Sequence, residues 1–125
     1  LEPNSPTYLN AYAYTLALQN KRLGEARQYA EQALEFAPDQ ASILDTLGYI
    51  AFLQNDFDTS AQVLAKAWQI SGSNATGVRY AKALYMQGAL DEFESVLQKI
   101  KQNQPDDPQL QQLDSLLLVP HSKKS

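Results

Sequence analysis

The feature that most constrains the fold of this chain is a sequence pattern that recurs after 34 and then 33 residues, carrying Ala33 to Ala67 and Ala67 to Ile100. The same offsets align one chain-breaking residue at the end of each segment: Pro38, Gly72 and Pro105. A fixed period of this length is typical of helical repeat arrays. The sequence therefore predicts an array of similar units in place of one irregular core.

Each unit contains two apolar patterns of helical period separated by a polar or glycine-containing break. The breaks fall at Asn20, Asn55 and Gln87. Residues three and four apart share one face of a helix, so each pattern predicts an amphipathic helix. We expect an all-α stack of about seven helices, right-handed and in a single domain. The expected repeats are 7–40, 41–73 and 74–107.

Small residues in the middle unit predict a close crossing of its two helices: Gly48, Ser60, Ala61 and Ala67. With these residues in this register, the chain resembles the tetratricopeptide repeat (TPR) family, and the resemblance implies an α-solenoid of three TPR helix-turn-helix repeats. Tyr14 stands where the family usually has glycine. Phe93 and Ile100 replace two small residues in the third repeat, which we therefore expect to be splayed or re-angled.

The two ends of the chain predict a fragment of a longer array. The segment 1–4 resembles the end of a preceding repeat. Pro108 can open a further helix at 108–119 that caps the array, followed by a disordered tail at 120–125. Leu116, Leu118 and Val119 exceed what one apolar face requires. They either wrap over the third repeat or form a homodimer or partner contact.

Composition and motifs argue against an enzyme, a metal site, a cofactor or a nucleic-acid partner. The formal net charge is −4, whereas binding to a phosphate backbone needs clustered Lys and Arg. The chain has no cysteine, no stretch of the length that spans a bilayer, and no phosphate-binding or nucleophile motif. Its single histidine, His121, falls in the expected tail. The cellular compartment stays open.

Polar residues near the expected helix starts are assigned to helix capping and not to catalysis. Asp56, Asp58, Asp91 and Glu92 favour the positive end of the helix dipole. Asn74 begins a pattern that glycosylation enzymes accept, but we expect it to cap the following helix.

The resemblance to the TPR family implies that the first helix of each repeat lines a concave groove. The partner-binding residues that this implies are Tyr8, Thr15, Gln19, Asp45, Tyr49, Phe52, Arg79, Lys82 and Tyr85. Neighbouring positions complete the expected surface: Ala11, Leu18, Leu53, Val78 and Met86. Arg79 and Lys82 could hold a carboxylate. Alternatively, Phe52 and Tyr85 lie in the seam between repeats and Arg79 is a solvated surface residue.

The family resemblance predicts a non-catalytic scaffold that binds a partner peptide or helix. A chaperone-tail clamp is disfavoured, because only Arg79 matches the basic and amide residues which that subclass uses. Two alternatives remain: an end-module that caps a longer array and self-associates, and a regulatory subunit of an enzyme encoded elsewhere. Short segments around Tyr49 and Arg79 resemble bacterial TPR proteins and favour a bacterial source.

Overall fold

The computed structural model describes residues 5–117 and contains helices without strands over that range. The helices are α1 (Pro6–Leu18), α2 (Leu23–Phe36), α3 (Ala41–Leu53), α4 (Phe57–Ser71), α5 (Asn74–Gln87), α6 (Leu90–Asn103) and α7 (Leu110–Leu117). The all-α architecture is the one predicted from the sequence period. Residues 1–4 and 118–125, which include Leu118, Val119 and His121, lie outside the described range, as does the side chain of Leu117.

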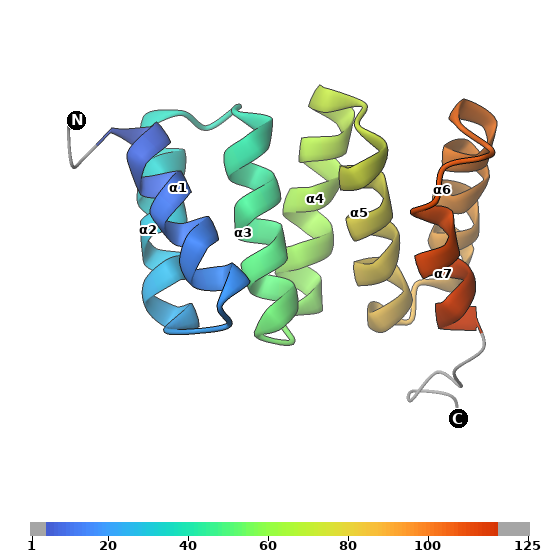
Figure 1. Ribbon diagram of the computed structural model, residues 1–125, viewed down its shortest axis with the longest axis horizontal. Coiled ribbons are helices and arrows are strands. Elements are labelled where there is room, and N and C mark those ends of the chain that lie inside the picture. The colour runs from blue at the N-terminus through green and yellow to red at the C-terminus, as the bar shows by residue number, and fades with distance from the viewer. Residues whose placement is uncertain (1–4, 118–125) are drawn as a thin grey trace.

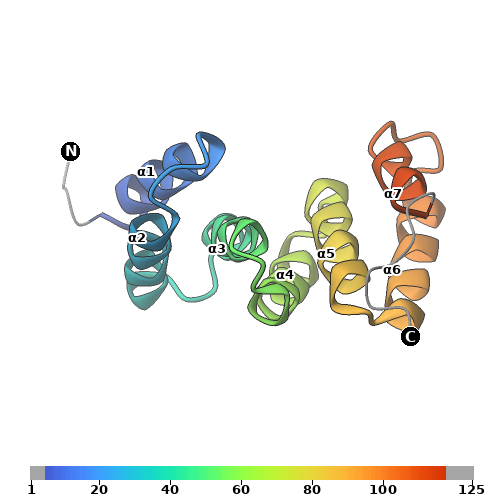
Figure 2. The same ribbon diagram turned by 90° about the horizontal axis from the view of Figure 1, so that it is seen from below.

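The helices form a single row in which each helix packs against the next one in the chain (Figure 1). Contacts also join α1 to α3, α3 to α5 and α5 to α7. Viewed from below, α1 and α7 rise on the same side of the row, with α3 set back between them (Figure 2). The row therefore has a concave side formed by the odd-numbered helices, and α2, α4 and α6 lie on the opposite side.

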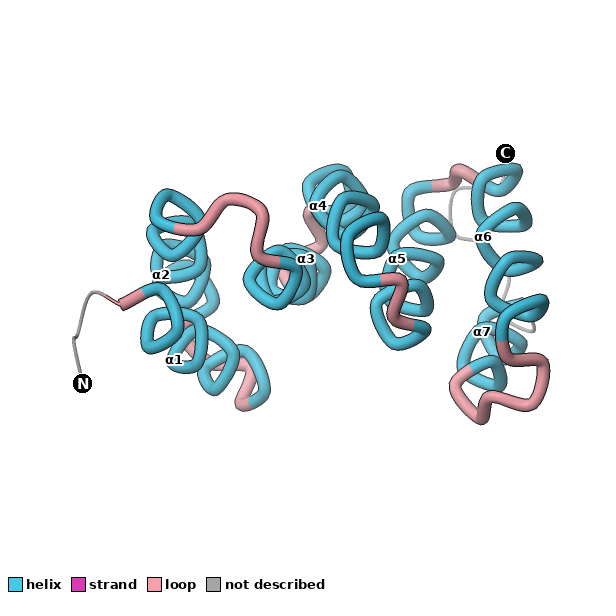
Figure 3. The backbone as a smooth tube through the Cα atoms, turned by 90° about the horizontal axis from the view of Figure 1, so that it is seen from above, coloured by secondary structure: helices cyan, strands magenta, loops and turns pink. Residues whose placement is uncertain are grey.

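Short turns separate the helices where the sequence predicts breaks (Figure 3). Asn20 and Asn55 adopt left-handed backbone conformations with φ of 54° and 63°, a region that asparagine tolerates better than most residues. Gly88 ends α5 with φ of 87°. The expectation that Asn74 caps α5 is wrong: Ser73 is the N-cap, and Asn74 is the first helical residue. The Asn74 side chain instead donates hydrogen bonds to the 104–107 loop.

The closest crossing in the row joins α3 to α4. The hydroxyl of Ser60 donates a 2.7 Å hydrogen bond to the carbonyl oxygen of Gly48. A Cβ atom on Gly48 would lie 2.4 Å from Cγ of Leu64, a separation that carbon atoms do not tolerate. The missing side chain of Gly48 is thus what allows α4 to approach α3, as the small residues predicted.

The third helix pair is less closely packed along the backbone than the first two. Fewer Cα atoms of α5 and α6 lie within 8 Å of each other than in either earlier pair, in keeping with the expectation that this repeat is splayed or re-angled. Phe93 and Ile100 are completely buried between them, and the Phe93 ring packs on Tyr85 with centroids 5.3 Å apart. Two large side chains at the positions where the other pairs have small ones hold the helices apart.

Helix α7 packs back on the third pair. Leu110 and Leu113 are buried in the same apolar cluster as Val78, Phe93 and Leu97, and Leu116 is half-buried against it. The Oδ1 atom of Asp107 accepts a 2.9 Å hydrogen bond from the backbone amide of Gln109 at the entrance to the helix. The described leucines of α7 therefore cover apolar surface of the array.

Candidate functional site

A hydrogen-bonded network centred on Arg79 occupies the middle of the concave side. Nη1 of Arg79 on α5 lies 3.0 Å from Oδ1 of Asp45 on α3. The hydroxyl of Thr76, one helical turn earlier, donates a 3.0 Å hydrogen bond to the other carboxylate oxygen of Asp45. The guanidinium carbon lies 4.7 Å from the centroid of the Tyr49 ring, within the range of a cation–π contact. Arg79 is thereby fixed against α3.

The network reaches helix α1 through Tyr14. The rings of Tyr14 and Tyr49 lie with centroids 6.1 Å apart. Burial alone would lower the pKa of Arg79, but the negative charge of Asp45 and the hydrogen bond that Arg79 donates to its carboxylate outweigh it, so the pKa is raised. The guanidinium is thus a permanently charged group whose charge is compensated inside the protein.

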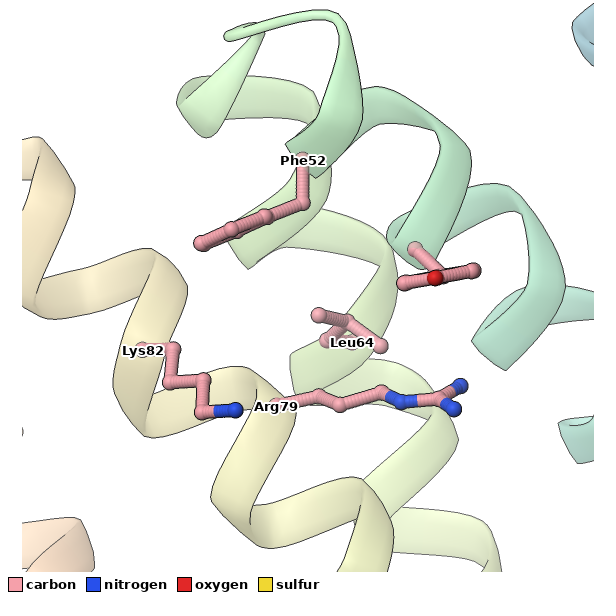
Figure 4. Close-up of a pocket in the computed structure, with 5 residues that line it drawn as sticks. Phe52, Leu64, Arg79 and Lys82 are labelled. Carbon is pink, nitrogen blue, oxygen red and sulfur yellow. The ribbon is translucent and has the colours of Figure 1, made fainter. Parts of the chain in front are cut away.

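A pocket of about 80 Å³ opens beside this network on the side of α4. Figure 4 shows Phe52, Leu64 and Lys82 around it, with the stem of Arg79 along one edge. Tyr49 completes the lining. The Phe52 ring meets Phe57 edge to face at 5.3 Å, which holds it in place. The wall of the pocket is therefore mostly apolar, with two cationic side chains at its edge.

Lys82 differs from Arg79 in having a neutral partner. Its ammonium group donates a short hydrogen bond to the side-chain oxygen of Gln112 on α7. Burial, followed by the positive charge of Arg79, lowers the pKa of Lys82. Both effects disfavour the charged form, and Gln112 does not offset them with a negative charge. Lys82 is thus the cation of this pocket whose charge is not balanced by one of the described carboxylates.

A second hollow of about 310 Å³ lies on the other side of Arg79, between α1, α3 and α5. Its lining residues are Asn10, Ala11, Tyr14, Ser42, Asp45, Thr46, Ala75 and Arg79. The Oδ1 atom of Asn10 is buried there and has no hydrogen-bond partner among the described residues. Arg79 therefore lies between two hollows, a smaller one beside α4 and a larger one that reaches α1.

The remaining residues implied by the family resemblance do not join this network. Thr15 and Gln19 are exposed on α1, and the Thr15 hydroxyl donates a 2.9 Å hydrogen bond to the Ala11 carbonyl of its own helix. Tyr8 is 42% exposed near the start of α1. Tyr85 is only 7% exposed because its ring packs on Phe93 between α5 and α6, so the structure places it in the seam and not on the groove surface.

Four residues of the groove were not singled out as site residues from the sequence: Tyr14, Leu64, Thr76 and Gln112. The signal for two of their contacts was the repeat itself. Asp45 and Thr76 are 31 residues apart, and Lys82 and Gln112 are 30 apart. Residues about one period apart occupy equivalent positions on adjacent odd-numbered helices, so such pairs are expected to meet across the groove.

Residues 5–117 contain no group of three or more His, Cys, Asp or Glu side chains arranged to hold a metal ion. Within that range, each helix is too short or too polar to cross a bilayer.

Comparison with known proteins gives two matches. Residues 51–117 match a family model described as tetratricopeptide repeat. A segment of 68 residues, 54% of this chain, is 38% identical to a TPR repeat-containing protein of Pseudomonas aeruginosa. The matched segment covers 12% of that bacterial protein, so the chain corresponds to a small part of its length.

Proposed function

Because this chain belongs to the tetratricopeptide repeat family, we propose that it is a non-catalytic module that binds a peptide segment or helix of a partner protein in its concave groove. TPR repeats generally mediate protein–protein interaction, and the family is typically a scaffold fold without catalytic activity. The observation that supports this site is the rigid arrangement of Tyr49, Phe52 and Arg79 around a small apolar pocket. Aromatic and arginine side chains that are already ordered lose little entropy on binding.

The chemistry of the groove favours binding over catalysis. The carboxylate of Asp45 already accepts hydrogen bonds from Arg79 and Thr76, so it is not free to act as a general base. The partner is therefore expected to contact Tyr49, Phe52 and Lys82, with Asp45 and Arg79 holding the surface in shape. On α1, Tyr8, Thr15 and Gln19 extend the surface toward the N-terminal end of the row.

Nuclear magnetic resonance can test this assignment directly, because the chain has a mass of only 13.9 kDa. The isotope-labelled protein would be titrated with pools from a random peptide library. Amide shifts confined to α1, α3, α5 and α7 are the expected result. Shifts confined to α2, α4 and α6, or the absence of shifts with every pool, would reject the groove as a binding site.

Self-association through the last helix stays a prediction. Leu110 and Leu113 are buried within the described fold, so the candidates for such a contact are the half-buried Leu116 together with Leu117, Leu118 and Val119. Sedimentation across a concentration series would detect it, and Leu117→Asp should abolish any dimer that forms there. A dimer that persists in this variant would place the contact elsewhere.

A further inference from the structure

We propose that the groove selects a peptide segment in which an aliphatic side chain enters the pocket between Tyr49, Phe52 and Leu64 while an adjacent carboxylate meets Lys82. This inference rests on the proposed peptide-binding function and names the chemistry of the peptide. It also assigns different roles to the two cations of the groove. Lys82 contacts the ligand, and Arg79 is a positioning residue.

The size of the pocket sets the first requirement. Its volume of about 80 Å³ is well below the roughly 300–1,000 Å³ of sites that hold a small-molecule ligand. Phe52 and Leu64 contribute apolar side chains to the lining, and one face of the Tyr49 ring is covered by the Arg79 guanidinium. A single branched aliphatic side chain matches both the volume and the apolar lining. Its burial is favourable because it removes apolar surface from water.

The charge at the edge of the pocket sets the second requirement. The guanidinium of Arg79 is neutralised by Asp45 at 3.0 Å, whereas Lys82 faces the neutral side chain of Gln112. A partially buried ammonium beside a second cation gains more from an incoming carboxylate than a solvated surface lysine does. The burial and like charge that lower the pKa of Lys82 are the features that such a carboxylate would offset.

The overall charge of the chain limits the acidity of the partner. Because the formal net charge is −4, further carboxylates of the segment gain no attraction from the protein as a whole. One carboxylate beside Lys82 offsets the positive charge there, and Lys82 is the cation of the pocket without a described acidic partner. A segment with a single acidic residue next to its aliphatic anchor is thus favoured over an acidic tail.

The test is a selection from a random linear peptide library displayed on phage, using the whole chain as bait. Parallel selections use Lys82→Glu and, as a matched control, Lys99→Glu, which makes the same charge change at an exposed site on α6. Wild-type protein and the Lys99→Glu variant should enrich peptides with an aliphatic residue next to Asp or Glu. Lys82→Glu should instead enrich a basic residue at that position. Circular dichroism and thermal unfolding check that each variant is folded.

The selected peptides would then be measured one by one in solution. Lys82→Met, which keeps most of the aliphatic stem, should reduce the affinity for an acidic peptide about tenfold, as expected for loss of a charge-assisted hydrogen bond. Replacing the peptide carboxylate by its amide should have the same effect on wild-type protein and none on Lys82→Met. Enriched peptides without an acidic preference, or equal selection by Lys82→Glu, would overturn this inference and leave the proposed function intact. Failure of wild-type protein to enrich any peptide would overturn both.

Discussion

The hydroxyl of Ser60 donates a 2.7 Å hydrogen bond to the carbonyl of Gly48, twelve residues earlier in the chain, at the point where α4 lies closest to α3. The bond forms because neither residue carries a large side chain at the contact. It fixes the middle helix pair, whose helices supply Tyr49, Phe52 and Leu64 to the pocket. The geometry of the groove therefore depends on a backbone contact in the interior.

Substitution of Gly48 by alanine should destabilise the protein by about 1–3 kcal/mol, because the new methyl group would collide with Leu64. Gly24 provides the matched control, since a Cβ atom there meets nothing within 4 Å. Gly24→Ala should leave stability unchanged or raise it by about 0.4–1 kcal/mol. Urea unfolding of both variants measures the difference. Equal effects at the two glycines would contradict the close crossing of α3 and α4.

Gly77 is expected to be similarly intolerant at the junction of α4 and α5. A Cβ atom on Gly77 would lie 2.8 Å from Nε1 of Trp68. Because Trp68 is the only tryptophan of the chain, its fluorescence reports on the surroundings of this one indole, which include Gly77 and Tyr80. Gly77→Ala should shift the emission of the folded state and lower stability by about 1–3 kcal/mol. An unchanged spectrum together with unchanged stability would show that the indole does not pack on Gly77.

The pair formed by Asp45 and Arg79 should show energetic coupling in a double-mutant cycle. Replacing either residue by alanine leaves the other half-buried without its charged partner, at a cost of about 1–3 kcal/mol. The double variant should lose less than the sum of the two single losses, with a coupling of about 0.5–3 kcal/mol.

The exposed pair of Lys66 and Asp39 is the control for this cycle, since its charged atoms lie 3.1 Å apart and its side chains are 48% and 81% exposed. Its coupling should be at most about 1 kcal/mol. A coupling energy between Asp45 and Arg79 that is no larger than the one between Lys66 and Asp39 would mean that Arg79 is not held in the groove.

The acid stability of the protein should depend on Asp56, the N-cap of α4. The Asp56 side chain accepts hydrogen bonds from Thr59 and Arg27, and these two partners, Thr59 first, lower its pKa below the ordinary value of 3.8. A depressed carboxyl pKa stabilises the folded state above the unfolded value and loses that contribution as the pH falls through the folded value. The extra stability is therefore complete near neutral pH and disappears below about pH 4.

Asp56→Asn isolates this charge, because asparagine is also a good N-cap. The free energy of unfolding of the wild-type protein should exceed that of the variant by about 0.2–1 kcal/mol at pH 7. This range is small because the Asp56–Arg27 pair is partly exposed to solvent. The urea midpoints should converge as the pH falls below 4. A difference that stays constant from pH 7 to pH 2 would contradict the lowered pKa.

The architecture followed from the sequence because it depends on local patterns that repeat. Each break between two helices lies within one helix pair, at Asn20, Asn55 and Gln87, and the small residue Gly48 also acts within one pair. These features can be recognised without knowing how neighbouring pairs pack. The mismatch at Phe93 and Ile100 was visible for the same reason. Local rules of this kind suffice when each unit contacts only the units next to it.

The different roles of Arg79 and Lys82 in the groove could not be predicted from the sequence. Arg79 and Lys82 are equivalent from residue type and spacing, and both were expected to be available to a carboxylate. What separates them is that Asp45 meets Arg79 across the groove while Gln112 meets Lys82. For Tyr85 both a groove and a seam position were open from the sequence, and the choice depends on the orientation of α6, whose Phe93 packs on the Tyr85 ring.

The loose packing of α6 against α5 affects the local stability of the array, that is, which helices open before the whole chain unfolds. In a linear array, stability is a sum of neighbour-to-neighbour terms, so a weak junction marks the place where part of the chain can open without global unfolding. We therefore expect α6 and α7 to open more readily than the first two helix pairs. The hydrogen bonds from Asn74 to the 104–107 loop and from Lys82 to Gln112 tie this C-terminal part to α5. A ligand that contacts Lys82 should therefore alter the rate of hydrogen exchange in the last two helices.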